Sequence, residues 1–318
     1  MAPFTPDTDL SLTPVTDLDA FARALAQWRP DRATSAASLR QRDLERGPGE
    51  YASRHWAQRA GVLVGAVTLD FPRTENQPGW LNLLVGSPEG ALLPELIGAG
   101  IRLARAAGAS TLITRVQENR PELAAYQAAG FREYDRRFTS ALNLTTFRPG
   151  AFAAREQQVQ QTGVRIRSLA KELAGQEFGE AQARRLYALV VSRLAAVPGQ
   201  VSVQPWPFEV WWARVGEKLD PRGVWLAVTL RGEWVGLSEL CVELEPGVLH
   251  TGLTGVEVGW QGRGVAYALK VAALRAAQAR GYREARTSNH AQNAPMLAVN
   301  RALGFVPDPA VVLLRRGI

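Results

Sequence analysis

One stretch of the chain decides its fold: Val256-Glu257-Val258-Gly259-Trp260-Gln261-Gly262-Arg263-Gly264-Val265-Ala266. The residues from His250 to Val258 alternate in a pattern that is typical of a β-strand. After the glycines the pattern becomes helical, with apolar residues on one face and polar residues on the others: Ala266, Leu269, Ala273 and Leu274, against Lys270, Arg275 and Gln278. The stretch therefore predicts a strand, a tight loop and a helix, in that order.

A glycine-rich loop between a strand and a helix forms a binding site for anions. The N–H groups of the first helical turn have no partner within the helix, and the helix dipole favours negative charge there. Gly262 and Gly264 allow the backbone to approach a bulky anion, and Arg263 adds positive charge. Because Gly-Lys-Ser/Thr and Gly-x-Gly-x-x-Gly are absent, the loop is neither a P-loop nor a dinucleotide-binding fingerprint.

The loop resembles the acetyl-CoA loop of the GCN5-related N-acetyltransferases, the GNAT superfamily, which is written Gln/Arg-x-x-Gly-x-Gly/Ala. The matching residues are Gln261, Gly262, Arg263, Gly264, Val265 and Ala266. The resemblance implies that their backbone N–H groups hold the pyrophosphate of acetyl-CoA. It also implies that the strand binds the pantetheine arm and the thioester through the backbone of Val256, Glu257 and Val258, with the Glu257 side chain directed away. The alternative interpretation is a glycine-rich turn without a ligand.

A second segment resembles the closing segment of the same superfamily, in which a strand leads to an asparagine that opens a helix, followed by Leu-Gly-Phe. It runs from Thr287 to Phe305. Asn293 can cap the helix, Pro295 suits its first turn, and Gly304 suits the left-handed position after its end. The resemblance implies that Asn293, with Asn289 on the strand before it, contacts the cofactor.

Composition limits the class of protein. The chain has 318 residues, a hydrophobic content of 46% and a net charge of +7. This length favours two domains, and the charge suits a polyanionic cofactor. No Lys/Arg run or basic helix supports nucleic-acid binding. The single cysteine, Cys241, excludes an intramolecular disulfide and a cysteine metal site, and we expect no metal. Because we find neither a signal peptide nor a membrane span, we expect a cytoplasmic protein.

The two halves of the chain repeat one order of elements. The sequence from Asn119 to Leu123 and the later Gly130-Phe131 pair recur at one constant offset, at Asn293 to Leu297 and at Gly304-Phe305. We therefore expect an α/β fold of two tandem GNAT-like domains, each a mostly antiparallel sheet flanked by helices. The expected boundaries are residues 1–148 for a degenerate first domain, 149–162 for a linker, and 163–318 for the domain with the acetyl-CoA loop. A last strand is expected from Val306 to Leu314.

The first copy lacks the acetyl-CoA loop. At the corresponding place it has Leu84 to Ala91, without the Gln/Arg-x-x-Gly-x-Gly/Ala pattern, and Glu89 places negative charge where phosphates would bind. We expect acetyl-CoA to bind only the second domain. The alternative is an altered second cofactor site.

Acetyl transfer to an amine needs a polarised carbonyl, an acceptor of the amine proton and a donor of a proton to the leaving thiolate. The superfamily's usual tyrosine acid is replaced by Asn300 here, whereas the first copy has Tyr126 at that position. Asn300 can hydrogen-bond the sulfur, or it serves the helix interface. His250 is the first candidate for the base because its ordinary pKa suits proton transfer, against the alternative of a turn histidine. Glu239 and Glu243 are further candidates on the preceding strand.

The acceptor of the acetyl group is the feature that the sequence indicates least clearly. The aromatic run from Trp206 to Trp212 either lines an apolar pocket or packs in a core. We expect an acetyl-CoA-dependent N-acetyltransferase that acts on a primary amine of a small molecule. A protein amine is the alternative acceptor, and a non-catalytic acyl-CoA-binding regulatory module is the alternative function. The sequence carries no signal for an oligomeric state.

Overall fold

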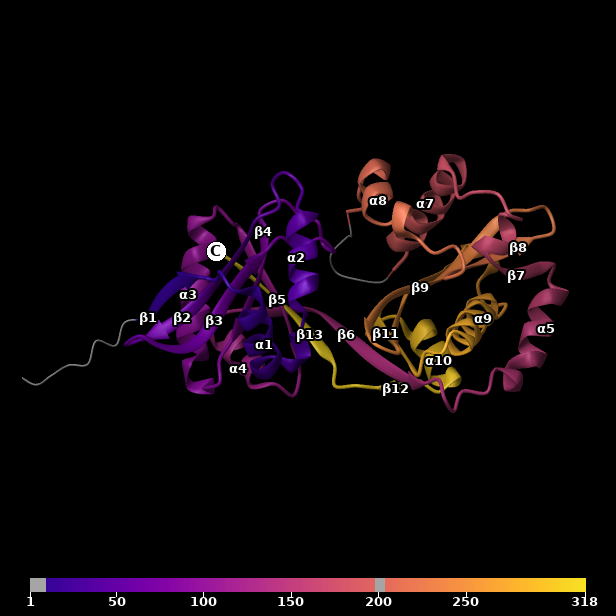
Figure 1. Cartoon of the computed structure of the whole chain (residues 1–318). Helices are drawn as coiled ribbons and strands as arrows, with labels where there is room; N and C mark the ends of the chain where they lie inside the picture. The colour runs from indigo at the N-terminus through magenta and orange to yellow at the C-terminus, as the bar shows by residue number, and fades with distance from the viewer. Residues whose placement is uncertain (1–9, 198–203) are drawn as a thin grey trace, which may run out of the picture. The chain divides into compact units, whose positions relative to one another are not determined.

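The computed structural model describes residues 10–197 and 204–318, except for the side chains of residues 240–245. The described chain forms two packing units (Figure 1). Unit 1 comprises the residues up to Arg136 together with 309–318, and unit 2 comprises residues 137–308. Each unit contains a mixed, mostly antiparallel sheet flanked by helices, which confirms the expected fold class.

The described part of unit 1 has six strands in the order β1-β2-β3-β4-β5-β13, and among them only the β4–β5 pair is parallel. The β2–β3 hairpin turns where the sequence predicts, because Ala60 and Gly61 both take positive φ angles of 49° and 75°. The elements of unit 1 are β1 (Leu10–Pro14), α1 (Leu18–Trp28), α2 (Ala36–Leu44), β2 (Ala52–Arg59), β3 (Val62–Asp70), β4 (Trp80–Gly86), α3 (Leu93–Ala106), β5 (Thr111–Gln117), α4 (Pro121–Ala128) and β13 (Val311–Gly317).

Alternating side chains of β3 and β4 build the two cores of unit 1. Leu69 and Leu83 are fully buried in the core that includes α3, whereas Ala66 and Leu84 pack with α1 and α2. Successive residues of a strand face opposite sides of the sheet, so α3 covers one face and α1 with α2 covers the other.

Unit 2 repeats this arrangement with the strand order β6-β11-β10-β9-β8-β7, and β12 pairs with β6. Here β10 and β11 form the parallel pair. The elements are β6 (Arg132–Asn143), α5 (Ala153–Gln161), β7 (Val164–Ser168), α6 (Leu169–Glu172), α7 (Glu180–Ala195), α8 (Phe208–Arg214), β8 (Val224–Thr229), β9 (Trp234–Glu245), β10 (Val248–Val256), α9 (Val265–Ala279), β11 (Glu284–His290), α10 (Ala294–Leu303) and β12 (Val306–Pro307).

The helices of unit 2 also cover both faces of their sheet. Val256 and Leu269 pack together on the α9 face, while Leu226 and Leu237 pack against α7 and α8. No helix within residues 10–197 and 204–318 combines the length and the apolar composition of a membrane span.

The two copies exchange a strand. β6 follows α4 in the sequence, yet its residues 137–143 pair with β11 in unit 2. β13, drawn in yellow beside β5 in Figure 1, pairs with β5 of unit 1 from Val311↔Gln117 to Gly317↔Thr111. Each unit is therefore completed by a strand that the sequence repeat assigns to the other copy.

This exchange changes the expected boundaries at 148 and 163. Residues 149–162 were expected to form a linker, but they contain a short 3-10 turn and α5, and they belong to unit 2. Val159 on α5 is 1% exposed and packs with Val265 of α9, so an apolar contact holds this segment in place. The expected last strand is also divided, since β12 pairs with β6 and β13 joins unit 1.

Candidate active site

The loop before α9 has the shape that its glycines predict. Gly262 and Gly264 take φ angles of 72° and 79°, in the left-handed region that other residues rarely adopt. Gly264 occupies the N-cap of the 15-residue helix α9, and no side chain accepts a hydrogen bond from the first turn. The N–H groups of this turn are therefore available to an anion, and a Cβ added at Gly262 would meet only open space.

The strand before the loop ends earlier than the alternating pattern predicts. β10 stops at Val256, and Val258 lies in a 3-10 turn (Val258–Trp260) with its side chain 75% exposed. The alternation ends because the side chain of Val256 packs in the core, whereas that of Val258 has no core to pack against and meets solvent. The Arg263 guanidinium lies 5.0 Å from the centre of the Trp260 ring, which holds its charge beside the loop.

An arginine that the sequence analysis missed fixes the end of β10. Arg193 on α7 donates from Nη1 to the Val256 carbonyl at 2.9 Å and forms an ion pair with Glu257 at 2.9 Å. The Val256 carbonyl also accepts from Gln261 Nε2 at 3.0 Å, which closes the loop. A Cβ added at Gly255 would lie 2.8 Å from the Arg193 Cβ, so glycine is required for this close approach.

β10 and β11 separate on the way to the loop. They pair at only three positions of the described strands, from Val248↔Glu284 to His250↔Arg286. Beyond them each strand pairs with its outer neighbour, β10 with β9 and β11 with β6. This opening leads directly to the loop from Gln261 to Gly264, and an extended ligand can lie against the backbone of β10 there.

Buried polar side chains come from the elements around this opening. Thr251 and Asn300 are 4% and 2% exposed, and the Oγ1 and Oδ1 atoms of these two residues have no hydrogen-bond partner within the described residues. Asn300 donates from Nδ2 to Asn289 Oδ1, so two predicted site residues meet. Unpaired buried acceptors are costly, and they mark a place where a ligand can supply the missing donors.

Asn293 and Gly304 delimit α10 as predicted. Asn293 Oδ1 accepts from the Met296 N–H at 3.3 Å, and Gly304 ends the helix with φ 91°. The cap is thereby confirmed, while a contact of Asn293 with a cofactor stays a prediction. His290, near the same segment, is buried, and its Nδ1 accepts from the Gln292 N–H at 2.9 Å.

Lys270 is the clearest correction to the helical pattern. Its place among polar residues predicts an exposed face, but the side chain is 2% exposed. Its Nζ lies 5.2 Å from the centre of the Phe305 ring and makes no hydrogen bond or ion pair with the described residues. Burial lowers the pKa of Lys270 to about 8. Its neighbours Leu269 and Val271 on α9 are completely buried, but a charged residue between them gives no local signal of its own burial.

The two candidate bases lie in different surroundings. Glu239 on β9 accepts from the Leu253 N–H of β10 at 3.3 Å, and burial raises the pKa of its carboxyl group to about 7. His250 lies at the last paired position of β10 and β11, where burial and then the charge of Lys270 lower its pKa. The side chain of Glu243 lies outside the described residues. The geometry therefore brings Glu239, and not His250, to the part of β10 that has left β11.

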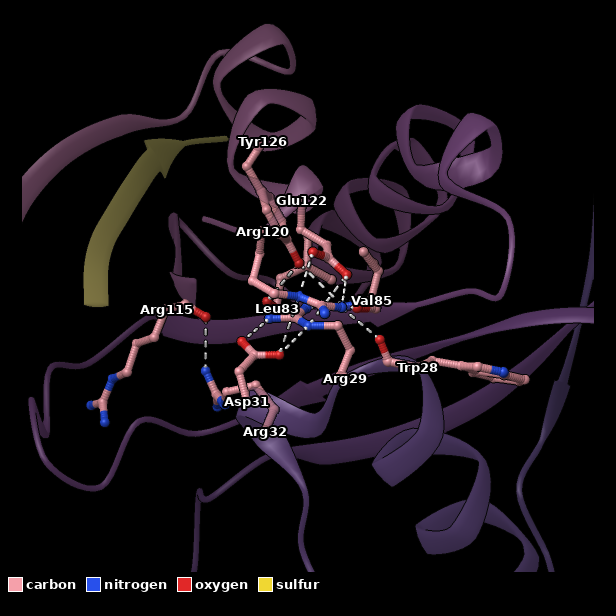
Figure 2. A network of polar contacts seen from close by, with 10 residues as sticks. All are labelled: Trp28, Arg29, Asp31, Arg32, Leu83, Val85, Arg115, Arg120, Glu122 and Tyr126. Carbon is pink, nitrogen blue, oxygen red and sulfur yellow. Dashed lines mark hydrogen bonds and ion pairs between the residues drawn. The ribbon is translucent and has the colours of Figure 1, made fainter. Parts of the chain in front are cut away.

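The corresponding opening in unit 1 is filled by side chains. β4 and β5 also pair at three positions, from Trp80↔Thr111 to Asn82↔Ile113. Beyond them the Tyr126 hydroxyl accepts from the Val85 N–H at 3.2 Å and donates to the Leu83 carbonyl at 3.1 Å (Figure 2). Tyr126 is fully buried, so it occupies the backbone edge that remains open in unit 2.

A charged network closes the same place from the other side. Arg29 is fully buried, donates to the Val85 carbonyl at 2.8 Å, and pairs with Asp31 and Glu122 at 2.9 and 3.5 Å (Figure 2). Before α3 the chain forms a 3-10 turn and then Leu93-Pro94, without a left-handed glycine cap. Within its described residues, unit 1 therefore has neither the open strand edge nor a left-handed glycine cap like that of α9.

The aromatic run of unit 2 packs mostly in a core. Trp211 is 7% exposed and lies 5.5 Å from Tyr187, whose hydroxyl donates to the Trp206 carbonyl at 2.5 Å. Of the two interpretations of this run, a pocket lining or a packed core, these contacts support the packed core. No group of three or more His, Cys, Asp or Glu side chains suited to a metal ion occurs in the part of the chain that the structure describes.

Neither a family model nor a curated protein matches the sequence. Solved structures do match. A GCN5-related N-acetyltransferase from Sphaerobacter thermophilus aligns with a TM-score of 0.69 at 19% identity, over 97% of this chain and 95% of its own. A tandem GNAT protein from the clavulanic acid biosynthesis pathway gives 0.70 at 19%, over 97% and 98%.

The glucosamine N-acetyltransferase region of a fungal multi-domain β-N-acetylglucosaminidase gives a TM-score of 0.72 at 13% identity, over 98% of this chain and 38% of that one. These alignments establish the fold. The chain has the tandem GNAT fold, as the two motifs predict.

Proposed function

We propose that the chain is an acetyl-CoA-dependent N-acetyltransferase with its active site in unit 2, acting on a primary amine of a small molecule. One observation carries the proposal: the open edge of β10 runs into a left-handed glycine loop that caps α9 without a side-chain acceptor. The similar solved structures, named as acetyltransferases, support the reaction class.

The residues of this opening suit acetyl-CoA. The N–H groups of Gly262 to Ala266 would hold the pyrophosphate at the start of α9, and Arg263 would add positive charge. The backbone of β10 up to Val256 would lie along the pantetheine arm. When bound, acetyl-CoA supplies an activated acetyl thioester. Asn289 lies near the end of β11, and Asn293 lies at the start of α10. Each already accepts a hydrogen bond through its Oδ1, so a contact with a ligand in the opening would be made in addition to that bond.

Glu239 is the residue that would accept the proton of the amine. A base works best when its pKa lies near the working pH, and a carboxyl group with a pKa of about 7 meets this condition. Its contact with the Leu253 N–H fixes it beside the open part of β10. His250 is the second candidate, with a pKa lowered by burial.

Lys270 would deliver the proton to the leaving thiolate, because Asn300 has no acidic proton near neutral pH. An ammonium group with a pKa of about 8 is a suitable donor to a thiolate, whose ordinary pKa in a thiol side chain is about 8.5. Asn300 would orient the sulfur through the second N–H of Nδ2, since its first donates to Asn289.

The test is release of free thiol from acetyl-CoA in the presence of a panel of primary amines, with mass analysis of the products. We expect turnover that depends on the amine, and no turnover in Gly264→Glu. Propionyl-CoA in parallel tests acyl preference, and a lysine-containing peptide tests the protein-amine alternative.

The second candidate function is a non-catalytic acyl-CoA-binding module. It is favoured by Asn300, which replaces the tyrosine that the superfamily resemblance leads one to expect. Calorimetry separates the two. One equivalent of acetyl-CoA bound per chain without thiol release for any amine would support the module and contradict the enzyme.

A further inference from the structure

Unit 1 contains a cavity that the proposed transfer reaction does not use. Its volume is about 410 Å³, and it lies between the α1–α2 segment and the face of β3, β4 and β5 that carries Thr68, Asn82 and Ile113. Strand alternation separates this face from the one that packs on α3. The size is within the range of small-molecule sites, which is roughly 300–1,000 Å³.

Two side chains of the lining present oxygen acceptors. Asn82 is 8% exposed and lines the cavity, and its Oδ1 has no hydrogen-bond partner within the described residues. Its Nδ2 donates to Asp70 Oδ1 at 3.2 Å, which fixes the orientation of the amide. Burial raises the pKa of Asp70 against the charge of Arg32 and the hydrogen bond from Asn82, and the carboxyl group forms no ion pair with a described residue. A carboxylate and an amide oxygen side by side are acceptors for a ligand's ammonium group.

The lining also presents a guanidinium with unused donors. Arg32 lines the cavity, and it donates one hydrogen bond from Nη1 to the Arg115 carbonyl at 3.2 Å (Figure 2). It forms no ion pair with the described residues. Burial, then the charges of Arg115 and Arg29, lower the pKa of Arg32 to about 10 against the opposing charges of Asp70 and Asp31, so it remains charged near neutral pH. Since a guanidinium carries five N–H groups, a ligand's carboxylate can take a bidentate pair.

Neighbouring arginines differ from Arg32 because their charges are already compensated. Arg115 pairs with Glu75 at 2.9 Å, and Arg54 pairs with Asp43 at 2.8 Å. Arg32 has no such ion pair, and its unused N–H groups at the wall of the cavity, together with the unpaired Oδ1 of Asn82, point to a ligand that supplies the missing hydrogen-bond partners.

Apolar side chains form the remaining wall. Phe21, Leu25, Leu39, Leu84 and Ile113 contribute to the apolar part of the lining. We propose that this cavity is a binding site for an α-amino acid with an apolar side chain, whose ammonium group contacts Asp70 and Asn82 and whose carboxylate contacts Arg32. Unit 1 lacks the acetyl-CoA loop, so this ligand is held and not acetylated there. The proposal goes beyond the proposed transferase activity and does not depend on it.

Calorimetry on the full chain tests the site with L-leucine and L-phenylalanine as probes. The matched analogues are 4-methylpentanoate, which lacks the ammonium group, and leucinamide, which lacks the carboxylate. We expect both amino acids to bind at least about 10-fold more tightly than either analogue, because each analogue lacks the partner of one charged group of the lining. Asp70→Asn and Arg32→Gln should each weaken leucine binding by at least about 10-fold.

Two controls make the result specific. Arg46→Gln alters an exposed guanidinium at the rim whose charge pairs with Asp43, and it should leave binding unchanged. Gly264→Glu alters the proposed acetyl-CoA loop of unit 2 and should also leave leucine binding unchanged, which separates this site from the proposed acetyl-CoA site. The proposal is overturned if neither amino acid binds at millimolar concentration, if either analogue binds equally well, or if binding survives both Asp70→Asn and Arg32→Gln in folded variants.

Discussion

The two parallel strand pairs, β4–β5 in unit 1 and β10–β11 in unit 2, differ mainly in what fills the space between them. Both pair over three positions and then separate. In unit 1 the long side chain of Tyr126 reaches across to the backbone of Leu83 and Val85. In unit 2 the shorter Asn300 stands at the repeated position and keeps an unpaired Oδ1. One side chain on the following helix therefore decides whether the opening is filled from within or remains available to a ligand.

A second feature is shared by the two units and therefore belongs to the framework. Arg29 and Arg193 each pack against a glycine at the end of the separated strand and donate to a strand carbonyl. An added Cβ would lie 3.3 Å from Arg29 at Gly86 and 2.8 Å from Arg193 at Gly255. The loops of the two units differ. Unit 1 keeps the contact between the arginine and the glycine, but its helix α3 begins without the glycine cap that precedes α9 in unit 2.

The largest expected effect comes from putting a charged side chain into the loop of unit 2. Gly264→Glu should abolish acetyl-CoA binding, because the carboxylate occupies the phosphate position and repels it. Calorimetry and a denaturation curve on the same sample measure binding and folding.

Two controls sharpen this test of asymmetry. Gly264→Ala has the same left-handed strain without the charge and should retain weaker binding. Gly90→Glu makes the corresponding change in unit 1, where an added Cβ meets open space, and should leave acetyl-CoA affinity unchanged. Two equivalent acetyl-CoA sites per chain in the unmodified protein would contradict the comparison.

The next largest effect concerns the proton acceptor. Glu239 becomes a carboxylate as the pH rises through about 7, so kcat/KM should rise through the same range. Glu239→Gln should remove this ascending limb and lower kcat/KM by roughly 10²–10⁴-fold. His250→Gln is the matched comparison and should retain the limb. If the limb is lost in His250→Gln and kept in Glu239→Gln, the roles of the two residues are reversed. Titration of the acceptor amine can also produce such a limb, so the profiles are measured with acceptors of different basicity.

Lys270→Met should have a smaller effect on rate and a distinct effect on stability. The ammonium group is lost as the pH rises through about 8, so kcat of the unmodified protein should fall in that range. In the variant, kcat should be lower by roughly 10²-fold or less at all pH values. Between pH 8 and the unfolded pKa of about 10.4, the unfolded chain binds a proton that the folded chain does not, so the free energy of unfolding rises with pH. Urea denaturation should show this rise, and the variant should lack it.

The smallest effect on function is expected in unit 1. Tyr126→Phe leaves the buried Val85 N–H and Leu83 carbonyl without their partner and should lower the free energy of unfolding by about 1–3 kcal/mol. Acetyl-CoA affinity and turnover should not change. A loss of acetyl-CoA binding in this folded variant would show that unit 1 takes part in cofactor binding.

The sequence predicts features that depend on local backbone geometry. Left-handed positions such as Gly264 and Gly304 and a helix cap such as Asn293 require particular residue types, so their roles follow from the chain alone. Burial of Lys270 could not be predicted in this way, because its charge assigns it to a polar face. Arg193 was missed because its partner Val256 lies far along the chain and only packing brings them together.

The exchanged strands were not predictable for a different reason. β6 and β13 have similar patterns, and either can supply an antiparallel neighbour to β5 or to β11. Local signals fix the strand but not its partner, so the expected division at residues 148 and 163 follows the repeat and differs from the packing units.

The placement of β13 imposes an order on biosynthesis. A ribosome finishes β5 at Gln117 and then makes the whole of unit 2 before residues 311–317 emerge to pair with it. During that interval the nascent unit 1 exposes a strand edge, which is a site for chaperones and for wrong pairing. Completion of the sheet of unit 1 is thus tied to completed translation of unit 2, because β13 is made after it.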